Sequence, residues 1–232
     1  MFISVEGPDY SGKTTQVAVI KDYYESIGKT VTVTREPGGT EIGMKIREIL
    51  VQEDSLNDPL SVTEQLLLLY TARLHHVDKV IIPALKRGEV VISDRYIDST
   101  YVYQGLIYNH KEAIDELLQV PTLKHLISRP DYTFYYDIDF DTVLTRMAAR
   151  GVSNKLDEKY AKLKELPIDA FKHHFYELNK KDPGAIKIID GCQDMQTVKE
   201  STLEVSKAVL EAFGDIRAPY LERVLEIKSW TW

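Results

Sequence analysis

The sequence predicts an α/β fold in which helices cover both faces of a parallel β-sheet. Short apolar or β-branched segments recur along the chain, and segments with helical periodicity lie between them. Connections of helical length are the ones that join parallel strands. The chain has 232 residues, of which 44% are hydrophobic and 28% charged, so one domain of this type with its own core is expected.

Five segments are predicted to be strands. Residues 2–5 are an apolar run, and residues 30–34, with the sequence TVTVT, are β-branched throughout. The apolar segments 89–93, 134–138 and 185–189 complete the set. A five-stranded parallel sheet is therefore expected.

Helical patterns fill the intervals between these strands. Thr40 can cap a helix after the break at residues 37–39. Ser61 and Glu64 have the spacing of a capping box, and the helix that they open is apolar almost all round, which predicts a central buried helix. Further helices are expected at residues 111–119, 141–150, 157–180 and 194–213.

Composition and charge exclude several classes of protein. The 29 Lys and Arg against 36 Asp and Glu give a net charge of −7, which disfavours binding to a nucleic-acid polymer. The single cysteine, Cys192, excludes an internal disulfide and a thiolate zinc site. The longest apolar run, residues 66–70, is too short to span a membrane, and the first residues carry no basic leader, so a cytoplasmic location is expected.

Residues 7–14, with the sequence GPDYSGKT, match the phosphate-binding pattern GxxxxGK[ST] and lie between a predicted strand and a predicted helix. Lys13 is expected to reach the β- and γ-phosphates, and Thr14 is expected to hold Mg²⁺. The motif predicts a three-layer P-loop NTPase fold that binds ATP. The predicted ATP-binding residues are Gly7, Pro8, Asp9, Tyr10, Ser11, Gly12, Lys13, Thr14 and Thr15.

A GTP switch is an alternative within this fold. Residues 154–157 spell NKLD, which matches the guanine-binding pattern NKxD. However, no apolar strand precedes them, and the only DxxG in the chain lies inside the P-loop, at residues 9–12. We therefore interpret NKLD as a coincidence on a mobile basic segment.

A second phosphate site is predicted at Asp94 and Arg95. Strand 89–93 delivers both residues at its carboxyl end, where ligands of such sheets bind. Asp94 can hold Mg²⁺ and Arg95 can clamp a second phosphate. The alternative is a structural Asp–Arg pair at a strand end.

Other polar residues have two interpretations each. Arg73 lies in an apolar helix, so it must meet either a protein carboxylate or a ligand. Arg47 lies on the polar side of its helix, where an arginine is usually a solvated surface residue. In the segment 99–105, Gln104 could bind a base edge, or Ser99 could merely cap a helix.

Residues 146–164 are rich in Lys and Arg. They are either a solvated helix face or a lid that brings positive charge to a transferring phosphoryl group.

These segments together resemble the thymidylate kinase family, over residues 1 to about 213. The likeness rests on the P-loop with an acidic Asp9, on REPGGT at residues 35–40, on TAR at residues 71–73, and on DRYIDSTYVYQG at residues 94–105. It implies a nucleoside-monophosphate kinase domain over residues 1–214 with a helical lid at about 146–164, followed by a C-terminal extension at 215–232. It also implies a homodimer and Mg²⁺-dependent transfer of the ATP γ-phosphoryl group to dTMP, giving dTDP and ADP.

The resemblance also implies roles for individual residues. Lys13, Arg95 and Asp9 would be catalytic, with lid charges from Arg150 and Lys155, because Tyr10 is not basic and the family then places its basic residue in the lid. Thr14 and Asp94 would hold the metal. The predicted substrate-binding residues are Asp9, Glu36, Pro37, Arg47, Leu69, Arg73, Arg95, Ser99, Thr100, Tyr103 and Gln104.

The sequence departs from the family pattern at several positions. Leu69 replaces a residue that is usually aromatic and stacks on thymine, and Lys155 replaces a lid arginine. These departures leave two alternatives open: a kinase for another deoxynucleoside monophosphate, such as dUMP or a modified pyrimidine nucleotide, and a catalytically degenerate nucleotide-binding module. For the extension after residue 215, packing on the core and support of a dimer both remain open.

Overall fold

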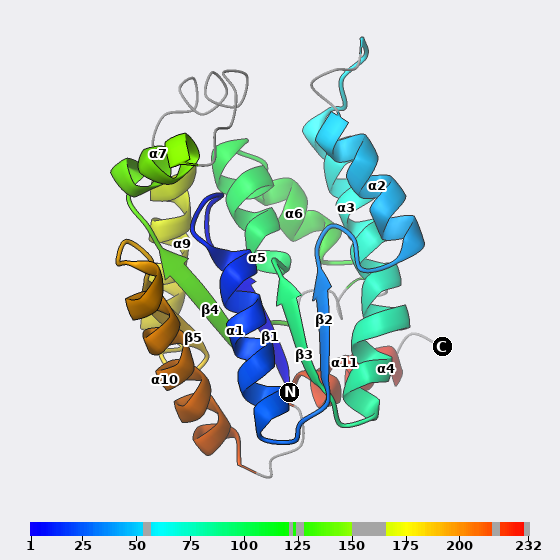
Figure 1. Ribbon diagram of the computed structural model, residues 1–232. Helices are drawn as coiled ribbons and strands as arrows, with labels where there is room; N and C mark the ends of the chain where they lie inside the picture. Colours follow the sequence, from blue (N-terminus) through cyan, green and yellow to red (C-terminus); the bar gives the residue numbers. More distant parts are fainter. Residues whose placement is uncertain (53–56, 121–122, 124–127, 150–165, 215–218, 230–232) are drawn as a thin grey trace.

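The computed structural model describes residues 1–52, 57–120, 123, 128–149, 166–214 and 219–229. These residues form a five-stranded sheet, all parallel, in the order β2-β3-β1-β4-β5 (Figure 1). The predicted fold class is confirmed, and the predicted strands match within one or two residues. The strands are β1 (Phe2–Glu6), β2 (Val31–Arg35), β3 (Val90–Asp94), β4 (Tyr132–Asp137) and β5 (Ile186–Asp190).

Helices cover both faces of the sheet (Figure 1). On one face, α1 and α10 pack on β1 and β3 through an apolar cluster that includes Ile20, Val209 and Ile92. On the other face, α3, α4, α6 and α11 pack around Phe2 and Val91. The helical segments are α1 (Lys13–Ser26), α2 (Glu41–Gln52), α3 (Val62–His76), α4 (Ile82–Lys86), α5 (Ile97–Thr100), α6 (Lys111–Leu117), α7 (Phe140–Ala149), α9 (Leu166–Lys181), α10 (Met195–Phe213) and α11 (Pro219–Ser229), with π-helical segments η2 (Val77–Ile81) and η3 (Tyr101–Ile107).

The register of the central strands determines where the functional loops emerge. β1 lies beside β3, with Val5 opposite Asp94. The two strands are parallel, so the loop after β1 and the residues after β3 leave the same edge of the sheet one strand apart. The P-loop and Arg95 are therefore neighbours.

Two predicted helix starts are confirmed. The Ser61 hydroxyl accepts from the Glu64 backbone N–H at 3.3 Å, and the Glu64 carboxylate accepts from the Ser61 backbone N–H at 2.7 Å, which is the capping box. The Thr40 hydroxyl accepts from the backbone N–H of Gly43 at 3.0 Å, as an N-cap should.

The prediction of a central buried helix after Ser61 is wrong. α3 packs on one face of the sheet and exposes its other side to solvent, where Leu67 is 50% exposed. Its buried side includes the polar residues Gln65, Arg73 and His76, which form hydrogen bonds to residues of neighbouring elements. The apolar pattern predicted burial on all sides, whereas polar side chains of this helix face inward at the candidate site and Leu67 faces solvent.

The C-terminal extension packs on the core within its described part. α11 contacts α4, and both Tyr220 and Val224 are buried in the cluster around Phe2. Helix α9 begins at Leu166, and the earlier part of the predicted helix 157–180 lies outside the described residues.

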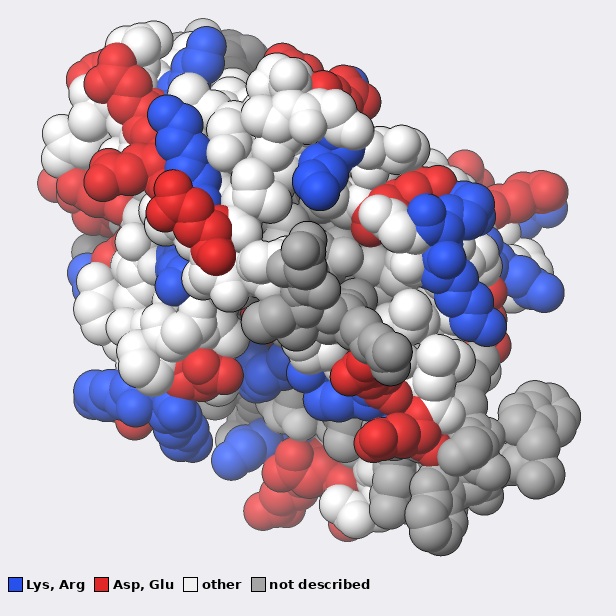
Figure 2. Space-filling model, turned by 90° about the horizontal axis from the view of Figure 1, so that it is seen from below, with Lys and Arg blue, Asp and Glu red and all other residues white. Residues whose placement is uncertain are grey.

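Charges are mixed over the face at the amino ends of the strands (Figure 2). Among the described residues, Lys and Arg alternate there with Asp and Glu and form no continuous positive area. No helix in the described ranges is long and apolar enough to cross a membrane.

Candidate active site

The P-loop joins β1 to α1 and has the backbone that its glycines predict. Gly7 and Gly12 have φ values of 151° and 90°, and α1 begins at Lys13 directly after Gly12. A Cβ on Gly7 would lie 2.8 Å from the Ser11 hydroxyl and 3.0 Å from the Tyr136 carbonyl oxygen, so the turn has no room for one. The loop therefore presents backbone N–H groups at a helix N-terminus, which is an anion-binding arrangement.

Lys13 is buried inside this loop. Its ammonium donates to the Pro8 carbonyl oxygen at 2.7 Å and lies 3.5 Å from the Ser11 hydroxyl. Burial, helped by the nearby charge of Arg95, lowers the pKa of Lys13 to about 7. A phosphate group bound in the loop would restore the charged form, so the lysine is poised for an anionic ligand.

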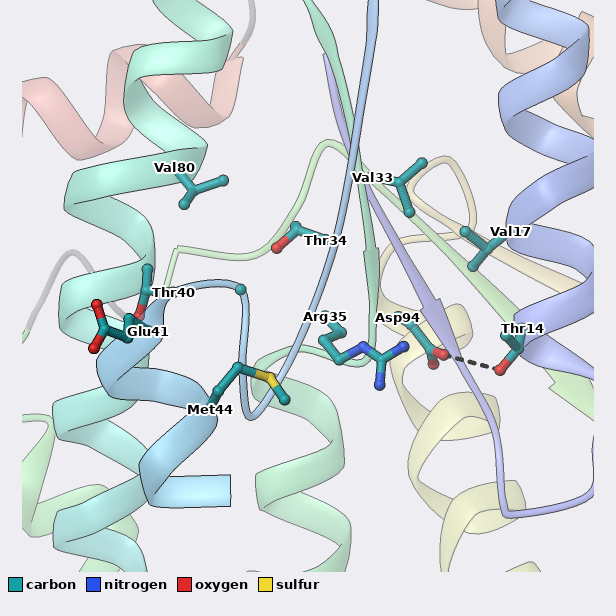
Figure 3. Close-up of a pocket in the computed structure, with 11 residues that line it drawn as sticks. Thr14, Val17, Val33, Thr34, Arg35, Thr40, Glu41, Met44, Val80 and Asp94 are labelled. Carbon is teal, nitrogen blue, oxygen red and sulfur yellow. Dashed lines mark hydrogen bonds between the residues drawn. The ribbon is translucent and has the colours of Figure 1, made fainter. Parts of the chain in front are cut away.

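Thr14 and Asp94 form a pair of oxygen donors beside the loop (Figure 3). The Thr14 hydroxyl donates to the Asp94 carboxylate at 3.1 Å, and both residues line a pocket of about 490 Å³. Hydroxyl and carboxylate oxygens are the ligands that Mg²⁺ prefers, and Mg²⁺ at nucleotide sites takes few protein ligands. The two predicted metal residues therefore fit such an ion.

Arg95 connects the P-loop with the second predicted phosphate site. It has a φ of 69° at the end of β3, and its guanidinium donates to the Gly7 carbonyl oxygen at 3.0 Å, to the Ser99 hydroxyl at 3.0 Å and to the Asp9 carboxylate at 2.6 Å. The guanidinium also lies over the ring of Tyr103, at 5.4 Å. Residues predicted to bind the donor and the acceptor thus share one cleft.

Glu6 is linked to Arg95 through the hydroxyl of Ser99. Its buried carboxyl accepts from the Tyr96 backbone N–H and from the Ser99 hydroxyl, both at 2.6 Å. Burial raises the pKa of Glu6 to about 8, with a further contribution from Asp98. The alternative in which Ser99 merely caps a helix does not hold, because α5 begins at Ile97 and the Ser99 hydroxyl links Glu6 to Arg95.

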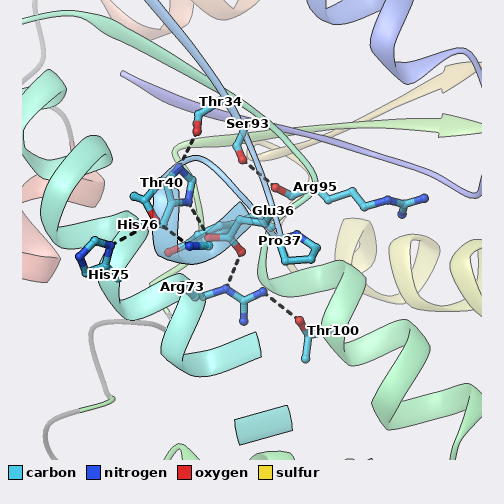
Figure 4. Close-up of polar contacts among 12 residues, drawn as sticks. Thr34, Glu36, Pro37, Thr40, Arg73, His75, His76, Ser93, Arg95 and Thr100 are labelled. Carbon is cyan, nitrogen blue, oxygen red and sulfur yellow. Dashed lines mark hydrogen bonds and ion pairs between the residues drawn. The ribbon is translucent and has the colours of Figure 1, made fainter. Parts of the chain in front are cut away.

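A buried network surrounds Arg73 (Figure 4). Its Nε donates to Glu36 at 2.7 Å and its Nη2 donates to the Thr100 hydroxyl at 2.8 Å. His76 Nδ1 lies 2.9 Å from the same carboxylate, and its Nε2 lies 2.6 Å from the Thr34 hydroxyl. Burial would raise the pKa of Glu36, but the charge of Arg73 and the hydrogen bond from His76 outweigh it and lower the pKa.

One donor of Arg73 stays without a protein partner. Its Nη1 is buried and has no hydrogen-bond partner among the residues that the structure describes. A buried guanidinium donor normally has an acceptor, so this atom marks where a ligand acceptor would be favourable. From the sequence, the partner of Arg73 could be either a protein carboxylate or a ligand. The structure shows the carboxylate of Glu36, and Nη1 is still available for a ligand.

Arg47 is not a solvated surface residue, contrary to the expectation from its helix position. It is half-buried on α2 and donates to the Pro37 carbonyl oxygen at 3.2 Å, where the Glu36–Pro37 peptide bond is cis. Burial and the neighbouring positive charge of Arg35 lower its pKa. Arg47 and Pro37 therefore face the same cleft as Arg95.

The remaining predicted acceptor residues lie on α3 and η3. Gln104 donates to Gln65 at 3.4 Å, and Tyr103 packs edge-on against Phe171, with ring centroids 5.4 Å apart. Leu69 is half-buried, whereas the adjacent Tyr70 is buried in the core cluster around Phe2 and does not take its place. The cleft thus lacks the aromatic side chain that the family pattern places on α3.

A second pocket, of about 530 Å³, opens on the other side of the P-loop. Tyr10, Gly12, Thr15, Cys192 and Met195 are among its lining residues. Its place beside the phosphate-binding loop and its apolar lining suit a nucleoside of the donor.

Arg146, the first residue of the predicted lid segment, also lines this second pocket. It lies on α7, and its guanidinium donates to the carbonyl oxygens of Tyr10 at 3.2 Å and Gly191 at 2.6 Å. The proposed lid residues Arg150 and Lys155, and the NKLD segment at 154–157, lie outside the described residues.

The fold and the site together define a P-loop protein in which two candidate phosphate-binding sites lie in one cleft. The comparisons with known proteins make this class more specific. A family model described as thymidylate kinase matches residues 5–202. A thymidylate kinase from Mesoplasma florum is 39% identical over 88% of this chain and 94% of its own length, and one from Pseudomonas savastanoi is 33% identical over 91% and 97%.

A solved structure agrees with these relatives. The crystal structure of thymidylate kinase from Ehrlichia chaffeensis is 31% identical, with a TM-score of 0.61, and the match covers 90% of this chain and 98% of that one. The chain belongs to the thymidylate kinase family, which confirms the resemblance on which the sequence-based assignments rest.

Proposed function

We propose that this protein transfers the γ-phosphoryl group of ATP to dTMP, producing dTDP and ADP. Membership of the thymidylate kinase family supports the reaction. The position of Arg95 is the structural observation that supports this reaction most directly. Its guanidinium donates to the P-loop carbonyl oxygen of Gly7 and to the acceptor-side hydroxyl of Ser99, each at 3.0 Å.

The reaction requires alignment and charge neutralisation rather than a covalent intermediate. An oxygen of the dTMP phosphate attacks the γ-phosphorus, the bond from that phosphorus to the bridging oxygen breaks, and ADP leaves with the electron pair. Lys13, now bonded to the Pro8 carbonyl oxygen, turns to the β- and γ-phosphates. Arg95 holds the acceptor phosphate at the same edge of the sheet, so the reacting atoms stay close.

Mg²⁺ is proposed as the metal, held through Thr14 and Asp94, and when bound it would neutralise charge on the donor phosphates. The two residues lie next to each other, at 3.1 Å, on the donor side of the cleft.

The acceptor nucleoside is proposed to lie between α3 and η3. Arg73 Nη1 is buried and is a donor for the carbonyl oxygen O4 of the base. Thr100 on α5 and Gln104 on η3 contact α3 through Arg73 and Gln65, and they would line the base pocket. Tyr103 would crowd the position of a ribose 2′-hydroxyl. Asp9, which pairs with Arg95, would face the sugar 3′-hydroxyl.

The family resemblance also supports three finer proposals. The segment at about 146–164 acts as a lid and delivers Arg150 and Lys155 to the transferring group. The protein forms a homodimer through α2 and α3, where Ile42, Ile49 and Leu67 are 44–50% exposed. The reaction takes place in the cytoplasm, which holds ATP and suits the free thiol of Cys192.

A coupled assay of ADP release tests the function directly. Purified protein with Mg²⁺ and ATP is offered dTMP, dUMP, dCMP, dAMP and dGMP, and dTMP is expected to give the highest kcat/KM. A preference for another monophosphate would refute the acceptor, and ATP binding without ADP release with any of them would refute the kinase.

Substitutions in the cleft test the assigned residues. Lys13→Ala and Arg95→Ala are each expected to lower kcat/KM for dTMP at least about a hundredfold. Lys199→Ala and Arg87→Ala remove exposed charges away from the cleft and are the matched controls. Activity near the controls in either cleft variant would remove that residue from the proposed machinery.

A further inference from the structure

Helix α11 lies beyond the part of the chain that the family model matches. The model ends at residue 202, whereas α11 spans Pro219–Ser229. The helix lies beside α4 near the amino ends of the strands, on the face of the sheet that carries α3 (Figure 1). The candidate active site lies at the opposite, carboxyl edge of the sheet, away from α11 (Figure 1).

Tyr220 anchors α11 to the segment that follows β3. Its hydroxyl lies 2.9 Å from the hydroxyl of Tyr96, and both side chains are fully buried. The ring of Phe2 packs edge-on against both tyrosines, with centroid distances of 5.0 Å and 4.8 Å. The backbone N–H of Tyr220 donates to Asp131 at 2.7 Å, and the other oxygen of that carboxylate accepts from the Phe2 backbone N–H.

A second contact ties α11 to the same segment from another side. The Arg223 guanidinium donates to the carbonyl oxygen of Arg129 at 2.8 Å. Arg129 in turn pairs with the buried carboxylate of Asp98 at 2.5 Å. Asp98 belongs to α5, two residues after Tyr96, so two separate contacts from α11 converge on residues 96–98.

Tyr96 connects this packing with the acceptor cleft. The guanidinium carbon of Arg73 lies 5.3 Å from the centroid of the Tyr96 ring, which forms one wall around that arginine. The backbone N–H of Tyr96 donates to Glu6, the carboxyl that also holds Ser99. A shift of the Tyr96 ring would therefore move the surface on which the Arg73 guanidinium rests.

We propose that α11 is a positioning element of the acceptor cleft, in which Tyr220 fixes the Tyr96 ring and thereby the orientation of Arg73. The proposal rests on the proposed role of Arg73 in binding the acceptor base. Tyr220 contacts neither substrate, so it is a positioning residue rather than a catalytic one. α11 would then act on dTMP binding and not on the donor side of the P-loop.

Tyr220→Phe is the decisive variant because it keeps the ring and removes the hydroxyl. We expect KM for dTMP to rise about fivefold, which corresponds to about 1 kcal/mol, while kcat and KM for ATP stay within about twofold of the wild type. Tyr96→Phe deletes the same hydrogen bond and should give the same split. The double variant should be no worse than the more affected single variant, because the two hydroxyls form one interaction.

Glu222→Gln changes an exposed side chain of the same helix and is the matched control. A helix that only contributes stability would lower the melting temperature in Tyr220→Phe without the split between the two KM values. An unchanged KM for dTMP, or a parallel rise of both KM values, would overturn the proposal. Deletion of residues 215–232 uncovers Phe2 and Tyr96 and risks unfolding, so the point variants decide.

Hydrogen–deuterium exchange provides a readout that needs no reaction. In the ligand-free protein, Tyr220→Phe should increase amide exchange in peptides covering residues 96–107, whereas Glu222→Gln should not. If the wild type phosphorylates no monophosphate, the proposed function fails, while this measurement still decides whether α11 orders the segment after β3. Equal exchange in the variant and the wild type would refute that ordering.

Discussion

Glu36→Gln tests the network that holds Arg73 in place. The substitution keeps the size of the side chain but removes its charge, leaving the Arg73 guanidinium buried without a carboxylate. Arg73 is 2% exposed and Glu36 is 5% exposed, and the atoms of the ion pair are 2.7 Å apart. Removing one partner of a buried pair of this kind costs about 3 kcal/mol or more.

An exposed pair in the same protein gives the reference value. Lys21 and Glu25 are one turn apart on α1, at 2.5 Å, with side chains 39% and 43% exposed. Such an exposed pair is screened by water and contributes little to stability. For a chain of this size, 1 kcal/mol corresponds to about 2–4 °C of melting temperature. Glu36→Gln is therefore expected to lower the melting temperature by about 6–12 °C, and Glu25→Gln to lower it much less.

The assay is thermal unfolding of the ligand-free proteins by calorimetry, followed by steady-state kinetics with dTMP and ATP. Glu36→Gln should also raise KM for dTMP more than KM for ATP, since Arg73 faces the acceptor and not the donor. If Glu36→Gln and Glu25→Gln shift the melting temperature equally, the buried pair does not have the strength that its geometry implies.

Three further predictions concern pH and acceptor binding. Burial raises the pKa of Glu6 to about 8, so between about pH 4.5 and 8 the carboxyl is ionised in the unfolded chain but protonated in the folded protein. The wild type should therefore lose stability as pH rises through this window, by at most about 1.4 kcal/mol per pH unit. Denaturant titrations of Glu6→Gln should show a weaker dependence of stability on pH. The pKa of Lys13 is about 7 without ligand, and a bound phosphate favours the charged form, so ATP binding above pH 7 should be accompanied by proton uptake. Calorimetry in buffers of different ionisation enthalpy measures this uptake. Proton release on ATP binding would contradict the assignment of Lys13. Leu69→Phe adds a ring for the base and should lower KM for dTMP about fivefold, or about 1 kcal/mol, and an unchanged KM would mean that the base does not lie against α3.

Local sequence patterns were sufficient for the sheet and for the phosphate loop. The strand at residues 2–5, the loop at 7–14 and the capping box at Ser61 each depend on neighbours within a few positions, and all three are confirmed. The adjacency of the P-loop and Arg95 follows from the rule that parallel strands end at a common edge.

Contacts between distant segments escaped prediction. The carboxylate that meets Arg73 is 37 positions away, and His76, which completes the network with Thr34, gave no sequence signal of its own because a lone histidine is common in cores. The resemblance to the thymidylate kinase family at residues 35–40, 71–73 and 94–105 located the cleft. It did not show which side chains pair within it. The packing of Tyr220 on Tyr96 spans 124 positions and needed the three-dimensional structure.

The phosphate-binding residues and the base pocket meet at the segment after β3, where Tyr96 contacts Arg73 and Glu6, but otherwise they depend on different elements. Gly7, Lys13 and Arg95 depend on the register of β1 and β3, whereas the surroundings of Arg73 are built from helices and from the turn after β2. Substitutions on α3 and η3 are therefore expected to change the contacts to the base while the register of β1 and β3 is kept. Laboratory selection for acceptors with unnatural bases should therefore begin at those helices and leave the strand ends untouched.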